Sequence, residues 1–205
     1  MEYIINHIRL CGTMETAPVF SHENHGRRFY SFILGVERLS GTLDRLRILA
    51  DWALLNEADC AWGERILVTG QVRSFNQITD TGRHLIISVY AETLELSDEA
   101  PDDQVTLTGA LCRDPVYRRT PLGREICDGM LAVNRSYRRT DYLPCIFWGR
   151  TARRIAALST GARITLTGRL QSRDYNKLLE NGEIERRTAY EISAVEIEEA
   201  QPDIL

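Results

Sequence analysis

The sequence of 205 residues lacks any apolar run approaching the roughly 20 residues that span a bilayer. The first ten residues include His7 and Arg9 and contain no signal-peptide core. Both absences favour a cytoplasmic, nucleoid-associated protein without a membrane partner.

Paired cysteines and catalytic motifs are also missing. The five cysteines are scattered, none forms a C-x-x-C pair, and their number is odd, so we expect no disulfide framework. There is no Walker loop and no G-x-S-x-G motif. His22 and His25 form an isolated H-x-x-H, to which no Cys/His cluster adds the further ligands that a metal site needs. We therefore expect no enzyme activity, no cofactor and no metal.

Lysine is nearly absent, and the positive charge is unevenly distributed. Residues 1–103 hold nine arginines against sixteen acids, a net charge of −7. Residues 104–197 hold fifteen arginines, Lys177 and ten acids, a net charge of +6. The overall charge of −4 therefore conceals a basic half. Arginine pairs with phosphate through two hydrogen bonds and stacks on bases, so a polyanion is a plausible ligand for this half.

An internal repeat dominates the sequence. Many residues recur in the same order 96 to 98 positions later. This period is too long for a solenoid and indicates a duplicated domain. We predict a first copy at 4–97, an acidic linker at 97–103, a second copy at 104–197 and an acidic C-terminal tail at 198–205. The matches include Gly12 with Gly109, Pro18 with Pro115, Arg38 with Arg135, Gly70 with Gly168, Ser74 with Ser172, and Trp52 with Trp148.

Each copy has a mostly β pattern. In the second copy, strand-like alternation at 105–109, 130–137 and 142–148 precedes an amphipathic segment at 150–158, and further alternating runs follow at 164–175 and 187–197. Three strands, a short helix and two strands are the order of an OB-fold, a five-stranded Greek-key barrel. The predicted fold class is therefore mostly β, with two tandem OB-fold barrels.

Alternation along 142–148 and 164–175 turns aromatic and arginine side chains away from the barrel interior. A single nucleic-acid strand exposes base faces that stack on aromatic rings, and its phosphates attract arginine. The pattern indicates a nucleic-acid surface, with a subunit interface as the alternative. The outward set is Tyr142, Trp148, Arg169, Arg173 and Tyr175, and nearby residues Arg135, Tyr137, Arg138 and Arg139 extend it.

The second copy resembles the bacterial single-stranded DNA-binding protein family. The resemblance covers nearly all of this copy and lies in LAVNRSYR (131–138), YLPCIFWGRTA (142–152), GARITLTGRLQSRDY (161–175) and RTAYEISAVEIE (187–198). It implies that four aromatic residues stack on bases: Tyr137, Tyr142, Trp148 and Tyr175. It also implies a homodimer that presents four OB domains, and leaves a partner-docking role for the short acidic tail open.

The first copy departs from this pattern. Three positions that are aromatic in the second copy are not aromatic in the first. Ser40 stands in place of Tyr137, Gln77 in place of Tyr175, and a non-aromatic residue near Leu46 in place of Tyr142. Together with the charge of −7, this predicts a degenerate copy that serves dimerisation, orientation or partner contact. Weak DNA binding through Trp52, Phe75 and Arg73 is the alternative.

The expected function is sequence-tolerant binding of single-stranded DNA by the second copy, in replication, recombination or repair. Arg135, Arg138, Arg139, Arg169 and Arg173 would contact phosphates. Fold alone does not decide function, so an OB-fold interaction scaffold or primosome-type accessory subunit remains the alternative. The residues do not distinguish DNA from RNA, and only the resemblance favours DNA.

Overall fold

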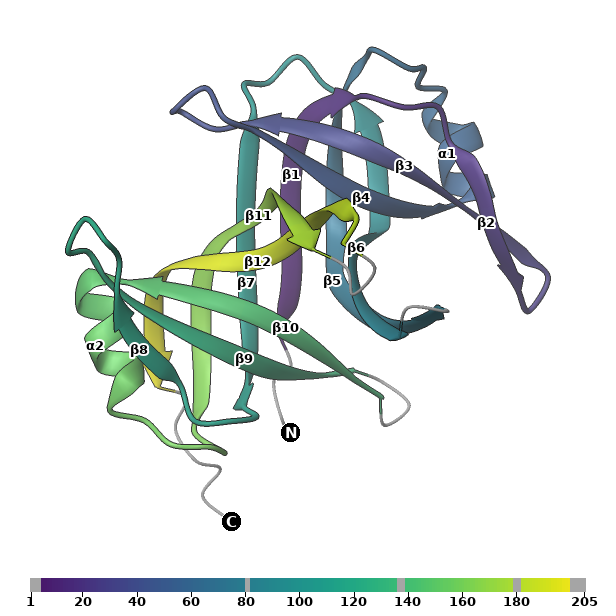
Figure 1. The fold of residues 1–205 in the computed structure, drawn as a ribbon. Helices are drawn as coiled ribbons and strands as arrows, with labels where there is room; N and C mark the ends of the chain where they lie inside the picture. Colours follow the sequence, from purple (N-terminus) through teal and green to yellow (C-terminus); the bar gives the residue numbers. More distant parts are fainter. Residues whose placement is uncertain (1–4, 80–81, 136–138, 179–181, 200–205) are drawn as a thin grey trace.

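The computed structural model describes residues 5–79, 82–135, 139–178 and 182–199. It has a helix in each copy and is otherwise built of strands (Figure 1). The first copy contains β1 (Asn6–Met14), β2 (Val19–Asn24), β3 (Arg27–Glu37), β4 (Leu43–Asp51), α1 (Trp52–Ala58), β5 (Arg65–Thr79) and β6 (Gly82–Leu96). The second contains β7 (Asp102–Leu111), β8 (Val116–Arg119), β9 (Glu125–Arg135), β10 (Arg139–Trp148), α2 (Gly149–Ala156), β11 (Arg163–Leu178) and β12 (Ile184–Glu199).

The element order confirms the predicted tandem OB fold. Each copy has the five expected strands and a short helix between the third and fourth, and α2 occupies the predicted segment 150–158. A short sixth strand, β2 or β8, is added at the outer edge of each copy. The segment between β6 and β7 is shorter than the expected linker, because Asp102 and Asp103 already belong to β7.

Each barrel closes around one apolar face of every strand. Leu143, Cys145 and Phe147 are at most 3% exposed, as the alternation along β10 predicts. The barrels close through the parallel pairs β4–β6 and β10–β12 and the antiparallel pairs β1–β3 and β7–β9. Burial of these faces forms one continuous cluster of apolar residues that runs through both copies.

A glycine in each copy lies at an irregularity in the pairing of the long fourth strand. Gly70 in β5 and Gly168 in β11 both lie at a register shift in the pairing with the following strand. A Cβ atom at either position would overlap a backbone carbonyl oxygen of that strand, Tyr90 O or Ser193 O. The matched glycines are therefore required by a close strand approach, which also explains why they recur in the repeat.

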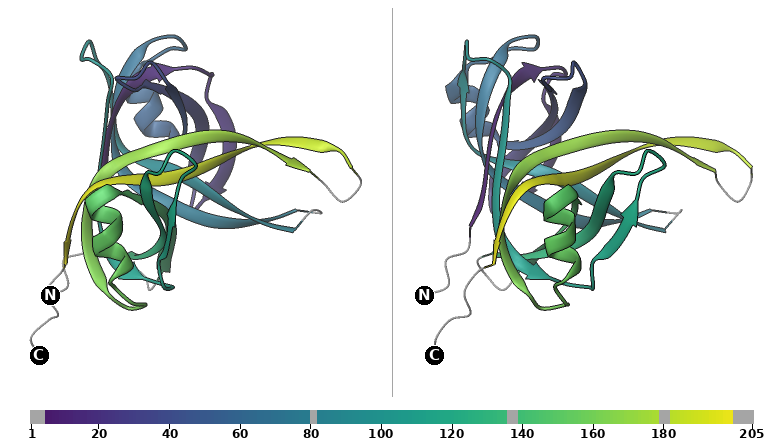
Figure 2. Two further views of the ribbon diagram at one scale, coloured as in Figure 1. Left: turned by 60° about the vertical axis from the view of Figure 1, so that its left-hand side comes forward. Right: turned by 90° about the vertical axis from the view of Figure 1, so that its left-hand side faces the viewer.

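The two barrels share one continuous sheet. β1 pairs antiparallel with β7, from Asn6 opposite Leu107 to Cys11 opposite Asp102. The two strands run side by side at the centre of the molecule in Figure 1. The hairpins β5–β6 and β11–β12 extend beyond the barrels (Figure 2), which brings each long hairpin beside the other copy.

The five cysteines are all free, and three of them are buried. Cys127 and Cys145 act as small apolar side chains in the core, whereas the Cys11 thiol donates to Ser97 Oγ and Glu99 O. Within the described ranges, neither helix has the length and apolar character needed to cross a bilayer.

Candidate nucleic-acid interface

Two buried junctions fix how the barrels face each other, and the repeat relates them. In one junction, the Ser74 N–H donates to Asp141 Oδ1 at 2.7 Å, and Ser74 Oγ accepts from the Tyr142 N–H at 2.8 Å. In the other, the Ser172 N–H donates to Asp44 Oδ1 at 2.7 Å, and Ser172 Oγ accepts from the Arg45 N–H at 2.8 Å. Each barrel thus offers an aspartate to a serine on the long strand of the other.

Because of these junctions, the β3–β4 hairpin reaches the second barrel and the β9–β10 hairpin reaches the first. Two grooves result, each lined by the outer face of one barrel and a hairpin of the other. Groove 1, over the first barrel, is lined by Ser21, His22, Asn24, His25, Arg27, Phe29, Ser31, Arg47, Leu49, Arg73, Phe75, Ser88, Tyr90, Arg135 and Arg139. Groove 2, over the second barrel, is lined by Arg38, Thr42, Leu43, Arg45, Arg118, Thr120, Ile126, Ile146, Trp148, Gln171, Ser172, Arg173, Asp174 and Glu191.

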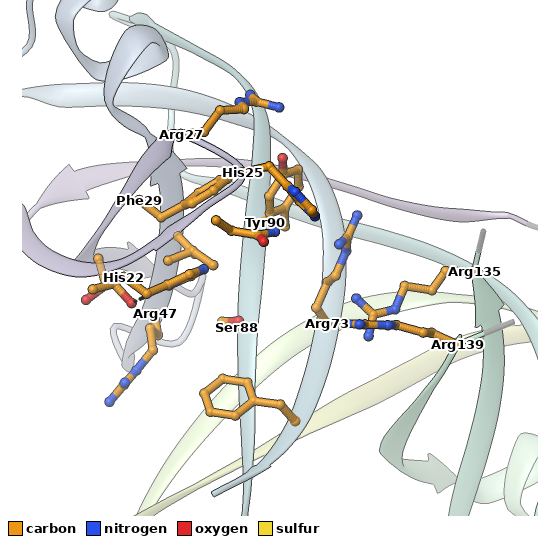
Figure 3. A pocket seen from close by; sticks show the side chains of 15 residues that line it. His22, His25, Arg27, Phe29, Arg47, Arg73, Ser88, Tyr90, Arg135 and Arg139 are labelled. Carbon is orange, nitrogen blue, oxygen red and sulfur yellow. Dashed lines mark hydrogen bonds between the residues drawn. The ribbon is translucent and has the colours of Figure 1, made fainter. Parts of the chain in front are cut away.

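Groove 1 is basic and aromatic. Five arginines line it, and the described lining residues include no carboxylate. The Arg73 guanidinium carbon lies 4.3 Å from the centre of the Tyr90 ring, and the Arg27 guanidinium carbon lies 5.7 Å from the Phe29 ring. Arg27 also pairs with Asp51 at 2.5 Å. Phe75 is 50% exposed, so its ring is available to a ligand. Figure 3 shows arginines entering this groove from both barrels.

Groove 2 has a mixed charge. Arg173 and Trp148 line it together with Asp174 and Glu191. Trp148 is 39% exposed, and its indole N–H donates to Ser193 Oγ at 3.2 Å, which fixes the ring against β12. Hydrogen bonds from Thr188 and Arg186 hold the pKa of Asp174 below its usual range, so this carboxyl stays ionised at neutral pH.

A third recess lies between the β5–β6 hairpin and the second barrel. It is lined by Tyr175 and Tyr190 from one copy and by Gln77 and His84 from the other. Tyr175 is 37% exposed, and the Arg173 guanidinium carbon lies 5.9 Å from its ring centre. Tyr175 therefore lies beside groove 2 but outside its described lining.

The structure brings together some of the predicted site residues and separates others. Trp148 and Arg173 lie in groove 2, but Arg135 and Arg139, which we assigned to the second copy's surface, lie in groove 1 with Arg73 and Phe75. Tyr142 is 47% exposed on β10 at the junction, outside the lining of both grooves. Arg169 is partly buried on β11, outside the same linings. Tyr137 and Arg138 lie outside the described residues.

Trp52 does not occupy the place of Trp148. Trp148 pairs with Ile126, and the corresponding pair in the first copy joins Phe29 to Asp51. Trp52 follows as the first residue of α1, and its ring lies 5.1 Å from that of Tyr30, outside groove 1. The structural equivalent of Trp148 is therefore Asp51, one residue before Trp52, although the sequence repeat aligns the two tryptophans.

Several groove 1 residues were not anticipated from the sequence, among them Phe29, Arg47 and Tyr90. Strand alternation in the first copy is the signal that could have found them, because it places Arg27 and Phe29 on one face of β3. His22, of the H-x-x-H, stacks on Phe29 with ring centres 5.0 Å apart. The described part of the chain holds no group of three or more potential metal-ligating His, Cys, Asp or Glu side chains.

The fold and grooves define a class of protein, the two-barrel OB-fold proteins with a basic, aromatic face. Comparisons with known proteins are more specific. The model of the Single-strand binding protein family matches residues 102–199. Single-stranded DNA-binding protein B of Bacillus subtilis is 36% identical over 80 residues, 36% of this chain and 71% of that protein. The chain belongs to the single-strand binding protein family.

Two further similar proteins show how much of the chain the similarity covers. Single-stranded DNA-binding protein A of Bacillus subtilis is 34% identical over 107 residues, 49% of this chain but only 60% of that protein. The wild-type single-stranded DNA binding protein from Thermus aquaticus has a solved structure that matches with a TM-score of 0.79 at 23% identity, over 100% of this chain and 97% of that one. This last likeness shows a shared fold over the whole chain.

Proposed function

We propose that this protein binds single-stranded DNA without catalysis, through grooves 1 and 2. The observation that carries the proposal is the lining of groove 1, where five arginines surround the half-exposed ring of Phe75 and no carboxylate is among the described lining residues. Phosphates attract guanidinium groups, and bases stack on rings such as Phe75. The names of the curated relatives support single-stranded DNA as the ligand.

Groove 2 extends this interface to the second barrel. Trp148 offers a partly exposed ring, and Arg173 lies close to both Trp148 and Tyr175. We assign base stacking to Trp148, Tyr142 and Tyr175, as the family resemblance implies, and add Tyr137 on the resemblance alone. Arg138 is proposed as a phosphate contact because the sequence places it next to Tyr137 and Arg139. Stacking tolerates any base, so little sequence preference is expected.

The first copy is accordingly proposed as a binding copy in its own right. Its net charge of −7 is an average over the whole copy and does not describe its groove. This revises the expectation of a degenerate copy and develops the alternative in which Phe75 and Arg73 contact DNA. Trp52 has no part in the proposal, because it lies outside the groove.

A homodimer with four OB domains completes the proposal. The dimer rests on the family resemblance. The proposed role of the protein is to protect transient single strands in the cytoplasm during replication, recombination or repair. Light scattering after gel filtration tests it: a dimer has twice the chain mass of 23.4 kDa.

Fluorescence anisotropy with labelled oligo-dT tests the binding function across a salt series. The groove 1 variant combines Phe75→Ala with Arg47→Gln, and the groove 2 variant combines Trp148→Ala with Arg173→Gln. Loss of one stacked base costs about 1–3 kcal/mol, so each variant should bind at least about fivefold more weakly. Affinity of the wild type should fall as salt rises, because binding releases counterions.

Trp52→Ala is the matched control, since it removes an exposed aromatic ring that lies outside groove 1. Failure of the wild type to bind oligo-dT would contradict the function and favour the interaction scaffold. Loss of binding in the groove 2 variant alone would indicate that the first copy does not bind DNA and serves dimerisation, orientation or partner contact.

A further inference from the structure

Three arginine side chains converge where groove 1 meets the second barrel. Arg73 comes from β5 of the first copy, and Arg135 and Arg139 come from the β9–β10 hairpin of the second. Figure 3 shows Arg135 and Arg139 extending toward the strand that carries Arg73. We call this set the arginine corner.

Two carboxylates, Asp141 and Glu92, act on Arg73, but neither forms a described ion pair with it. Asp141, which is 0% exposed, lies 3.1 Å from Arg135 Nε through its Oδ2 atom, and its Oδ1 atom already accepts from the Ser74 N–H. Arg73 donates to the neutral Gln71 side chain at 3.1 Å and lies over the Tyr90 ring, but its buried Nε has no hydrogen-bond partner. Within the described residues, no ion pair involves the Arg139 side chain.

The excess positive charge has an energetic consequence. Burial, followed by the charge of Arg135, lowers the pKa of Arg73 from its usual value. The Arg73 and Arg135 guanidinium groups thus repel each other where Arg73 is partly desolvated. An anion between them would relieve that repulsion and complete the missing hydrogen bonds.

The repeat provides an internal reference for this corner. The matched positions in groove 2 are Gln171 for Arg73, Arg38 for Arg135 and Thr42 for Arg139. Arg38 is neutralised there by Asp44 through two hydrogen bonds of 2.6 and 2.7 Å. At the matched positions the arginine corner therefore has three arginines, whereas its counterpart has one arginine that is paired directly with an aspartate.

We infer that the arginine corner is a phosphate-binding subsite built by both copies, which holds a backbone phosphodiester where a nucleic-acid strand passes from one barrel to the other. The counterpart corner lacks the charge for this, so the strand crosses between the barrels on one side of the molecule. This inference rests on the proposed function, which supplies the strand.

Exchanging residues between the two corners tests the inference without introducing foreign side chains. Arg73→Gln with Arg139→Thr gives the arginine corner the residues of its counterpart. Oligo-dT affinity should fall about tenfold, and the slope of log affinity against log salt should become shallower by about 0.7 for each phosphate that is no longer bound. Gln171→Arg with Thr42→Arg should steepen the slope by a similar amount.

Arg113→Gln is the control, because Arg113 is exposed on the loop before β8 and lines neither groove. Circular dichroism and thermal melting establish that each variant is folded. Wild-type binding that the first exchange weakens no more than Arg113→Gln does would overturn the subsite while leaving the function intact. No wild-type binding at all would overturn the function itself.

Inorganic phosphate distinguishes a free anion from a backbone phosphate. Phosphate should raise the Tm of the wild type relative to chloride at equal ionic strength, and the first exchange should remove this difference. Phosphate stabilisation accompanied by an unchanged oligo-dT salt slope in that variant would identify a site for free phosphate and overturn the assignment to a nucleic-acid strand.

Discussion

Grooves 1 and 2 have the same backbone plan and different chemistry. Both are made by the outer face of one barrel and a hairpin of the other, and both are anchored by a buried Asp–Ser junction. Their exposed linings differ: five arginines and no described carboxylate in groove 1, four arginines with Asp174 and Glu191 in groove 2. The copies thus match where packing restricts the side chain and differ where a ligand would be contacted.

Net charge is a poor guide to the chemistry of either groove. The more acidic copy carries the more basic groove, because its acids lie largely elsewhere and because the other copy contributes Arg135 and Arg139. Ligand preference depends on the charges that line a site, including those contributed by a neighbouring domain.

The largest expected effect is on the buried junctions that both grooves share. Asp141→Ala leaves Arg135 without its carboxylate and Ser74 without an acceptor, so unfolding free energy should fall by about 3–5 kcal/mol. Asp44→Ala should cost a comparable amount, because it removes the matching partner of Arg38 and Ser172. Urea denaturation measures both effects.

The control for these variants is Asp128→Ala, which breaks the exposed pair with Arg118, whose side chains are 35% and 52% exposed respectively. Its cost should stay below about 1 kcal/mol. If Asp141→Ala were no more destabilising than Asp128→Ala, the junctions would not be what orients the barrels.

The next effect concerns a buried position at which the copies differ. Asn6 bonds to both Val72 N and Val72 O at 2.8 Å, whereas its counterpart Asp103 accepts from Leu170 N at 3.1 Å. Burial raises the pKa of Asp103 from 3.8 to about 8. The folded state therefore retains a proton that the unfolded state releases, and stability should fall as pH rises from about 4 to about 8.

Asp103→Asn should give the second copy the bonding of Asn6 and remove this pH dependence. The Tm at pH 9 should rise by at least about 4 °C, which for a chain of this size corresponds to about 1–2 kcal/mol. Thermal melts between pH 5 and 9 measure the effect. A wild-type Tm that does not change between pH 5 and 9 would contradict the burial of an ionisable Asp103.

The relative contributions of the two grooves form the third prediction. Trp148→Ala and Phe75→Ala should each weaken oligo-dT binding by about 1–3 kcal/mol, because each removes one stacking ring. A double variant whose effects add would indicate that both grooves contact one strand independently. An effect of Trp148→Ala alone would confine stacking to the second barrel.

The smallest effect is expected at Trp52. Trp52→Ala removes the packing against Tyr30 and the Arg28 guanidinium carbon, 5.9 Å from the indole ring, and so should lower the Tm slightly. Its oligo-dT affinity should change less than about twofold, since the ring is outside groove 1 and no stacked base is removed. A loss of affinity as large as that of Trp148→Ala would mean that the DNA path leaves the groove and follows α1.

Much of the fold was predictable because strand alternation and the repeat can be recognised in the sequence alone. The buried face of β10 and the helix between the third and fourth strands both follow from residues near one another in the sequence. The extra strands β2 and β8 were not predicted, since both are short, exposed edge strands without an alternating burial pattern.

The sequence by itself determined the duplicated OB fold, the apolar faces of the strands and the types of side chain available to bind a strand. Tertiary structure decided which of those side chains meet: the β9–β10 hairpin carries Arg135 and Arg139 into groove 1, and a one-residue difference in register excludes Trp52 from it. The physical reason is that burial patterns act along one strand, whereas a groove between barrels depends on contacts such as Asp141 with Ser74, which join residues 67 positions apart.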